Sequence, residues 1–89
     1  MLDLIMTGQF KRDLKRIQKR SLELELLKNV IRLLLEEQTL DEKYRDHALT
    51  GSYRGFRECH IQPDWLLIYR VRDGVLYLER TGSHSDLFL

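Results

Sequence analysis

Alternating apolar and polar residues in the second half of the chain predict a β-hairpin. Residues 65–72 and 75–81 each have the pattern of a strand, and Asp73-Gly74 between them is the two-residue loop that type I′ turns favour. In the simplest register Arg72 pairs with Val75, so that Leu67 faces Arg80. Alternation then places one set of side chains on a core face: Trp65, Leu67, Tyr69, Val71, Leu76 and Leu78, with Arg80 at its far end.

The first half of the chain alternates briefly and then changes to helical spacing. Residues 2–6 predict a short strand, and Thr7 after it can cap a helix. Apolar residues recur at i, i+4 and i+7 over 10–17, which predicts a helix with one buried face. A wider apolar stripe over 24–35 predicts a second helix, for which Ser21 is the expected N-cap.

The remaining segments complete an α+β pattern. Residues 36–50 lack a clear period and indicate a loop, whereas 56–61 indicate a strand that ends at Pro63, because proline cannot donate to a ladder. The order is strand, helix, helix and then three or four strands. We therefore expect one domain, 1–89, with two helices on one face of an antiparallel sheet of about four to five strands.

Composition adds three expectations. The chain is 43% apolar and 33% charged, has no apolar run long enough for a membrane span, and does not open like a signal peptide. A lone Cys59 suits a reducing compartment, so we expect a cytoplasmic protein with no membrane partner. The net charge of +1 hides a basic segment, residues 11–20, that holds six basic residues and one acid.

The basic segment lies on the predicted first helix and is a candidate RNA-binding surface. Contacts to phosphate need positive charge and no base recognition, which such a helix supplies, although a merely solvated face is the alternative. The residues assigned to it are Lys11, Arg12, Lys15, Arg16 and Lys19.

Antiparallel geometry brings four residues that could carry chemistry to one edge of the sheet. His60 and Asp64 lie just before the first strand of the hairpin, whereas Arg80 and His84 lie at or beyond the end of the second. Histidine can act as acid or base near neutral pH, and arginine matches phosphate oxygens. This set suits RNA cleavage by attack of a 2′-hydroxyl on the adjacent phosphate, a reaction that needs no metal and no cofactor.

In this prediction His84 is the general acid, Asp64 orients His60 as the base, and Arg80 stabilises charge on the phosphate. Cys59 and His60 are adjacent on a strand and point to opposite faces, which argues against a shared metal site and against a cysteine nucleophile. Trp65 could stack on RNA bases or cap the core.

Four motifs resemble the YafQ toxins of the RelE/ParE superfamily: His-Ala-Leu-Thr-Gly at 47–51, Arg-Glu-Cys-His at 57–60, Pro-Asp-Trp-Leu-Leu-Ile-Tyr at 63–69 and Arg-Thr-Gly-Ser-His-Ser-Asp-Leu-Phe at 80–88. The resemblance implies a RelE-like fold. It further implies a type II toxin that cleaves messenger RNA in the ribosomal A site and is neutralised by a DinJ-type antitoxin.

The family's active-site set maps onto this sequence as His47, His60, Asp64, Trp65, Arg80, His84 and Phe88. Phe88 takes the place of the terminal aromatic residue, for which docking of the carboxyl terminus is the alternative role. Ala48 departs from the family, in which proline often follows the loop histidine. Two other functions stay open: a ParE-like toxin that inhibits DNA gyrase, and an RNA-binding module without catalysis.

Overall fold

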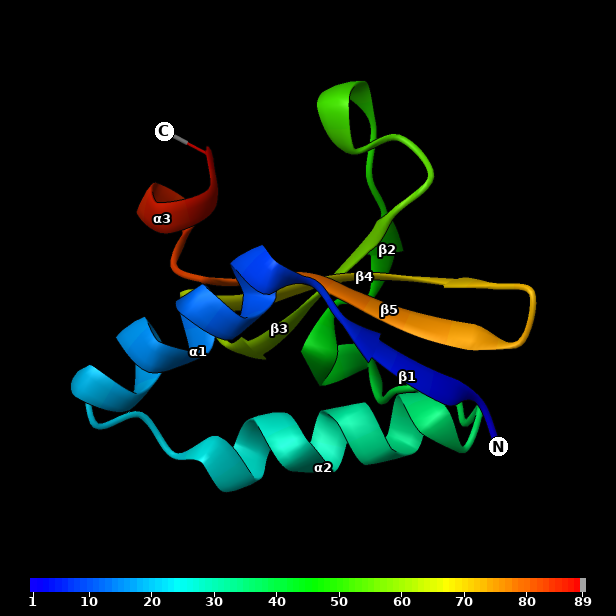
Figure 1. The fold of residues 1–89 in the computed structure, drawn as a ribbon, viewed down its shortest axis with the longest axis horizontal. Helices are drawn as coiled ribbons and strands as arrows, with labels where there is room; N and C mark the ends of the chain where they lie inside the picture. Colours follow the sequence, from blue (N-terminus) through cyan, green and yellow to red (C-terminus); the bar gives the residue numbers. More distant parts are fainter. Residues whose placement is uncertain (89) are drawn as a thin grey trace.

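The computed structural model describes residues 1–88, and its centre is a five-stranded sheet in the order β1-β5-β4-β3-β2 (Figure 1). The strands are β1 (Asp3–Met6), β2 (His47–Ala48), β3 (Arg57–Gln62), β4 (Trp65–Arg72) and β5 (Val75–Gly82). The helices are α1 (Gly8–Lys19), α2 (Leu24–Leu35) and α3 (His84–Phe88), with the 3₁₀ turns η1 (Glu42–Tyr44) and η2 (Gly51–Tyr53).

The predicted α+β class and strand number are confirmed, with one difference in strand direction. β1 pairs with β5 in parallel, whereas the other three pairings are antiparallel, so the sheet is mixed. A parallel pair needs a long crossover, and α1 and α2 lie in the connection that leads from β1 back to the sheet.

The β4–β5 turn is the predicted one. Asp73 and Gly74 both have positive φ, 52° and 77°, as a type I′ turn requires, and Arg72 pairs with Val75. Val71 was expected in the core but is 50% exposed, because it lies near the tip of the hairpin.

The far end of the hairpin differs from the predicted register. A β-bulge shifts the pairing by one residue, so that Leu67 faces Thr81 and Arg80 faces Ile68. The prediction that Leu67 faces Arg80 is therefore wrong. The shift moves Arg80 to the opposite face of the sheet from Leu67, and this face carries the candidate site.

Each face of the sheet has its own apolar cluster. The larger cluster packs the sheet against α1 and α2 and includes Phe10, Ile17, Leu27, Val30, Cys59, Trp65, Leu67, Tyr69, Leu76 and Leu78. The smaller cluster joins Leu66 and Ile68 of β4 to Leu87 of α3. In Figure 1, α3 and the turn after β2 lie on the side of the sheet away from α2.

The helix starts follow local capping chemistry. Thr7 caps α1 as predicted, because its hydroxyl accepts the backbone N–H of Phe10. Ser21 does not cap α2: it has a positive φ of 58°, and the helix begins after Glu23. Within residues 1–88 there is no helix with the length and apolar character that crossing a membrane requires.

Candidate active site

Two rows of paired residues across β3, β4 and β5 form the base of the site. His60 pairs with Leu66, which pairs with Gly82, and the next row runs from Glu58 through Ile68 to Arg80. Directly paired residues point to the same face of a sheet, so His60, Glu58 and Arg80 share the face that α3 covers in part. His60 and Arg80 are two strands and one row apart, about 10 Å across the strands and about 7 Å along them.

His84 is held by Asp64. Asp64 Oδ1 accepts the backbone N–H of His84 at 2.9 Å and lies 2.5 Å from the ring Nδ1. These contacts, the backbone hydrogen bond first, lower the pKa of Asp64. With Nδ1 engaged by a carboxylate, Nε2 of His84 is the ring nitrogen left for substrate.

His60 meets a different carboxylate from the predicted one. Its Nε2 lies 3.4 Å from Glu58 Oε1, and the Nε2 of His47 lies 3.6 Å from the same oxygen. Glu58 is only 6% exposed, which places a buried carboxylate between the two imidazoles. The prediction that Asp64 orients His60 is therefore wrong, because Asp64 is bonded to His84 and Glu58 is the carboxylate beside His60.

The two histidines of the sheet edge do come together. The ring centroids of His60 and His84 are 5.8 Å apart, with the planes inclined by 66°. Each imidazole thus has its own carboxylate, Glu58 or Asp64, and the two rings are arranged edge to face. A base and an acid with separate partners are what a two-proton reaction needs.

Arg80 is fixed by a residue of α1 that the sequence did not point to. Arg80 Nε donates to Asp13 Oδ2 at 2.8 Å and Nη2 donates to Oδ1 at 3.3 Å. Asp13 is fully buried, and the hydrogen bond to it is the main reason that the pKa of Arg80 is raised. Arg80 therefore stays charged, and its side chain, 20% exposed, has a set direction.

Trp65 lies in the core rather than on the surface. It is 2% exposed, and its indole N–H donates to the hydroxyl of Thr81 at 3.0 Å. That hydroxyl donates to the carbonyl of Leu66, and the Thr81 backbone N–H donates to Asp13. The indole is not available for base stacking in this conformation, so its place matches the core alternative and fixes the strand that carries Arg80.

Asp86 attaches α3 to the rest of the molecule. Its carboxylate accepts two hydrogen bonds from Arg20, which follows α1 directly, at 2.6 and 3.0 Å, and one from the backbone N–H of Ser83. The Ser83 hydroxyl in turn accepts the backbone N–H of Asp86, which completes a capping box. Arg20, first among these partners, lowers the pKa of Asp86.

The approach of Asp86 requires a glycine at position 82. Gly82 has a φ of +154°, and a Cβ there would lie 2.8 Å from Asp86 Oδ2. The chain can therefore turn from β5 into α3 only without a side chain at this point, and His84 and Phe88 are placed by that turn.

Asp46 fixes the loop that carries His47. It accepts the phenol of Tyr69 at 2.5 Å and is paired with the Arg57 guanidinium. Burial, followed by the hydrogen bond to Asp46, raises the pKa of Tyr69, so the phenol remains a donor. Nδ1 of His47 contacts the carbonyl of Arg45 at 2.7 Å, which directs Nε2 toward Glu58. His47 is thus held on both sides, despite Ala48 where relatives often have proline.

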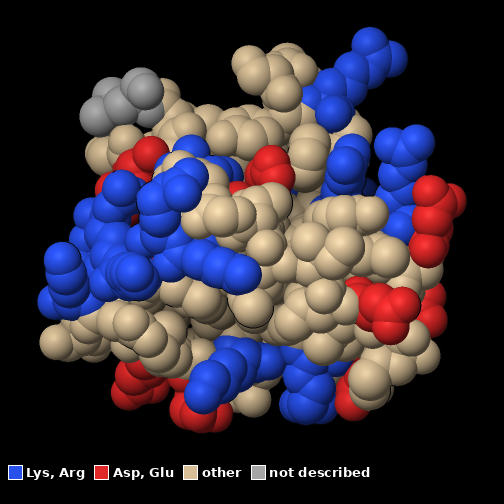
Figure 2. Space-filling view, viewed as in Figure 1, with Lys and Arg blue, Asp and Glu red and all other residues tan. Residues whose placement is uncertain are grey.

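The basic helix has two kinds of side chain. Figure 2 shows Lys and Arg gathered over α1. Arg16 and Arg20 pair with Asp86, and Arg12 donates to Gln9, so these side chains have internal partners. Lys11, Lys15 and Lys19 are exposed and make no ion pair within residues 1–88.

Phe88 is 47% exposed and meets the ring of Tyr53 edge-on, with the centroids 5.9 Å apart. A partly exposed aromatic ring can stack on a base. Phe88 therefore keeps both predicted possibilities: its ring contacts Tyr53, and it remains in part exposed.

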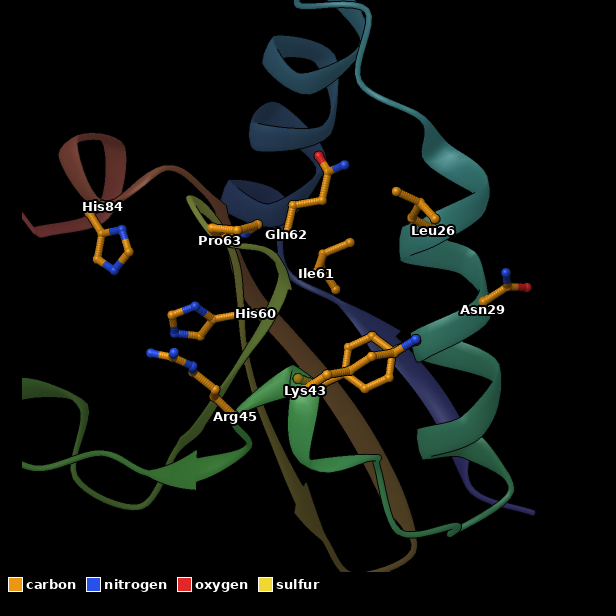
Figure 3. Close-up of a pocket in the computed structure, with 10 residues that line it drawn as sticks. Leu26, Asn29, Lys43, Arg45, His60, Ile61, Gln62, Pro63 and His84 are labelled. Atoms are coloured by element: carbon orange, nitrogen blue, oxygen red, sulfur yellow. The ribbon is translucent and has the colours of Figure 1, made fainter.

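A groove with a volume of about 660 Å³ opens beside the histidine pair (Figure 3). It is lined by His60 and His84 at one end and by Leu26, Asn29, Lys43, Tyr44, Arg45, Ile61, Gln62 and Pro63 along its length. In Figure 3 the rings of His60 and His84 and the guanidinium of Arg45 lie at the same end.

Within residues 1–88, no group of three or more His, Cys, Asp and Glu side chains has the arrangement to hold an ion. Cys59 is fully buried on the helix side of the sheet, away from His60. Burial is the main reason that the pKa of its thiol is raised to about 12.

Sequence patterns missed the carboxylates that support the site. In the sequence, Asp13 is the single acid of a basic segment, and Glu58 was given no role of its own. Their signal is an acid placed where a polar side chain should be costly: Asp13 lies beside the apolar stripe of α1, and Glu58 precedes the buried Cys59 in a strand.

Comparison with known proteins gives matches over nearly the whole chain. Residues 2–89 match the family model described as bacterial toxin of type II toxin-antitoxin system, YafQ. The mRNA interferase toxin YafQ of Escherichia coli strain K12 is 42% identical over 87 residues, which are 97% of this chain and 95% of that protein.

Solved structures share the fold over the whole length. YafQ from Escherichia coli strain BL21(DE3) superposes with a TM-score of 0.95 at 40% identity, covering 100% of both chains. A YafQ chain in an Escherichia coli DinJ–YafQ complex gives a TM-score of 0.93 at 41% identity, again with 100% of both chains covered.

Proposed function

Because this chain belongs to the YafQ family of bacterial type II toxins, we propose that it is an endoribonuclease that cleaves messenger RNA on the ribosome. The observation that carries the proposal is the pair His60 and His84, 5.8 Å apart, each beside its own carboxylate. Relatives named mRNA interferase support the class of substrate.

In this mechanism His60 removes the proton of a 2′-hydroxyl, and the 2′-oxygen attacks the adjacent phosphate. Glu58 stabilises the resulting imidazolium, and His47 shares that carboxylate on the base side. His84 donates a proton to the departing 5′-oxygen, so that the products are a 2′,3′-cyclic phosphate and a 5′-hydroxyl.

Arg80 stabilises the negative charge that develops on the phosphate. Its guanidinium is fixed by Asp13 before substrate arrives, so little reorganisation is needed during the reaction. Phe88 offers an aromatic face to a base near the cleaved bond. No step in this scheme uses a metal.

Ribosome association is assigned to α1. The exposed Lys11, Lys15 and Lys19 can contact ribosomal RNA, whereas Arg16 and Arg20 are engaged with Asp86. The proposal that the active site acts in the ribosomal A site follows from the family resemblance.

A DinJ-type antitoxin is the proposed protein partner. A DinJ–YafQ complex is known for the Escherichia coli relatives. A positively charged helix next to the site favours an acidic segment in that partner, since opposite charges on two surfaces direct association. An antitoxin can silence the toxin by covering the histidines or by displacing α1 from the ribosome.

Primer extension on translating ribosomes tests the proposal. Addition of the chain is expected to produce truncated messages with defined ends, and His84→Gln, added in equal amount as a folded protein, is expected to remove them. Growth arrest without any cleaved message would refute the proposal and support gyrase inhibition, and ribosome binding without cleavage would support a non-catalytic module.

A further inference from the structure

Arg45 differs from the arginines that build the fold. Arg20, Arg57 and Arg80 each hold a carboxylate, whereas the Arg45 guanidinium has no ion-pair partner within residues 1–88. Figure 3 shows it directed toward the ring of His60. A planar cation without an internal partner, at the end of a groove that contains both histidines, is suited to a phosphate.

The backbone around Arg45 is fixed by hydrogen bonds, although its side chain makes no ion pair with the rest of residues 1–88. Arg45 has a left-handed φ of 49°, uncommon for a residue other than glycine. Its N–H donates to the carbonyl of Glu42, its carbonyl contacts His47 Nδ1, and the next residue, Asp46, is bound to Tyr69. The hydrogen bonds on both sides of Arg45 therefore set its position beside the groove.

The rest of the groove has the chemistry that binds a single nucleotide. Tyr44 is a half-buried aromatic residue, Asn29 and Gln62 carry amide groups, and Ile61 supplies an apolar wall. Proteins recognise unpaired RNA bases by stacking and by hydrogen bonds to base edges. A volume of about 660 Å³ lies within the range of ligand sites in proteins.

We propose that this groove, from Asn29 to His60, binds the single-stranded RNA nucleotide that adjoins the cleaved phosphate. Arg45 holds a phosphate oxygen, and the base lies toward Tyr44 and Asn29. The inference rests on the proposed endoribonuclease function, because the histidines determine which phosphate is cut. It adds a second cationic contact, on the side of the histidines opposite to Arg80.

Binding is tested without cleavage by an NMR titration of the full ¹⁵N-labelled chain with a 2′-O-methyl ribotrinucleotide, which lacks the attacking hydroxyl. Backbone amides of Tyr44, Arg45 and Gln62 are expected to shift in a saturable way, while those of the hairpin tip at Asp73 and Gly74 stay unchanged. The proposal would be overturned if amide shifts were confined to α1 or α3, or if no amide shifted at millimolar RNA. It would also be overturned if the amides of the groove shifted only on addition of an antitoxin.

A matched pair of variants tests the role of Arg45. Arg45→Asn keeps the left-handed backbone, which asparagine tolerates, and Arg72→Asn removes the same charge at the exposed end of β4. Loss of a charged hydrogen bond to phosphate is expected to weaken trinucleotide binding about tenfold for Arg45→Asn, with less than about a twofold change for Arg72→Asn. Equal effects of the two variants would contradict a specific contact.

The two proposals can fail separately. If the wild-type chain binds the trinucleotide in the groove but cleaves no message, the endoribonuclease proposal is wrong and the groove remains an RNA site. If it cleaves but Arg45→Asn binds and cleaves like Arg72→Asn, the groove proposal is wrong and the catalytic proposal stands.

Discussion

A single oxygen of Asp64 contacts both the backbone N–H and the ring Nδ1 of His84, although the two residues are 20 positions apart. Asp64 lies in the turn between β3 and β4, and His84 begins α3 after β5. The contact therefore joins the β3–β4 turn to the end of β5 at one end of the sheet, and it fixes both the start of α3 and the direction of the imidazole.

Asp64→Asn is expected to slow single-turnover cleavage by about tenfold or more, but by less than the roughly 10²–10⁴-fold loss expected for His84→Gln. The amide keeps an acceptor for the backbone N–H and loses the negative charge beside the ring. Asp3→Asn, an exposed change on β1, serves as the control. Cleavage by Asp64→Asn at the wild-type rate would show that the carboxylate is not needed for the proton transfer.

The same pair predicts a dependence of stability on pH. The hydrogen bonds from His84 lower the pKa of Asp64, so their contribution is fully present above the ordinary aspartate pKa of about 3.9. It is lost as the pH falls below that value through the pKa of the folded state. Urea unfolding of wild type and Asp64→Asn from pH 7 to pH 2.5 should therefore show a difference that shrinks toward low pH. A constant difference would contradict this.

Gly82→Ala is expected to disorder α3 and abolish most cleavage. The new methyl group would lie 2.8 Å from Asp86 Oδ2, so the carboxylate must leave Arg20 and Ser83. We expect a loss of about 1–3 kcal/mol in the free energy of unfolding. Gly74→Ala is the control, because its φ is also positive but nothing lies within 4 Å of the added Cβ.

The readout is amide hydrogen exchange in α3 together with single-turnover cleavage. Faster exchange over residues 84–88 in Gly82→Ala, but not in Gly74→Ala, is the expected result. Equal exchange in both variants would show that backbone strain alone, and not the contact with Asp86, limits the position.

The parts of this fold that the sequence predicts are those set by local chemistry. Helical spacing, the Thr7 cap and the Asp73-Gly74 turn each depend on neighbours within a few positions. The bulge that moves Arg80 to the other face has no local signal, because it results from pairing between strands. This shift of one residue makes Thr81, and not Arg80, the partner of Leu67. It also moves the Arg80 side chain to the other face of the sheet.

The residue types of the candidate site were predictable from the sequence, but the carboxylate that lies beside each histidine was not. The hairpin brings His60 and His84 to one edge, as expected. Which carboxylate each ring meets depends on the geometry of the β3–β4 turn, which points Asp64 at α3 and leaves Glu58 beside His60. Asp13 reaches β5 only because α1 runs along the part of that strand that β1 does not cover.

Cys59 is expected to be unreactive in the native protein. Its thiol is fully buried, and burial, followed by the charges of Asp46 and Glu58, raises its pKa to about 12. At pH 8, labelling by a disulfide reagent should be slow in buffer and complete within the mixing period in concentrated urea. Because the folded state favours the neutral thiol, its contribution to stability is present below a pH of about 8.5 and is lost as the pH rises above it. Rapid native labelling would show that β3 opens locally.

Reversal of Lys11, Lys15 and Lys19 to Glu is expected to weaken ribosome association and make its salt dependence shallower. These lysines have no ion pair within residues 1–88, so their change leaves the α3 attachment at Arg16 and Arg20 intact. Fewer counterions are then released on binding. Lys28→Glu on α2 is the control, and wild-type binding by the triple variant across a salt series would identify α1 as a merely solvated surface.

Asp13→Ala is expected to be the most damaging change at the site, because it removes the partner of Arg80 while leaving the guanidinium in place. Asp13 is fully buried and also accepts the backbone N–H of Thr81. Breaking a buried ion pair from one side costs about 3–5 kcal/mol, and the partial exposure of Arg80 places the expected loss near the lower end, about 3 kcal/mol. Urea unfolding at pH 7 measures it.

Asp13→Asn separates charge from hydrogen bonding at the same position. The amide oxygen can still accept from Thr81 but no longer neutralises Arg80, so a smaller loss of stability is expected. In the fraction that stays folded, Arg80 loses its set direction, and single-turnover cleavage should fall more than ribosome affinity does. If Asp13→Ala unfolds at the wild-type urea midpoint and cleaves at the wild-type rate, the pair neither stabilises the fold nor positions Arg80, and charge stabilisation at the phosphate must be assigned to another cation.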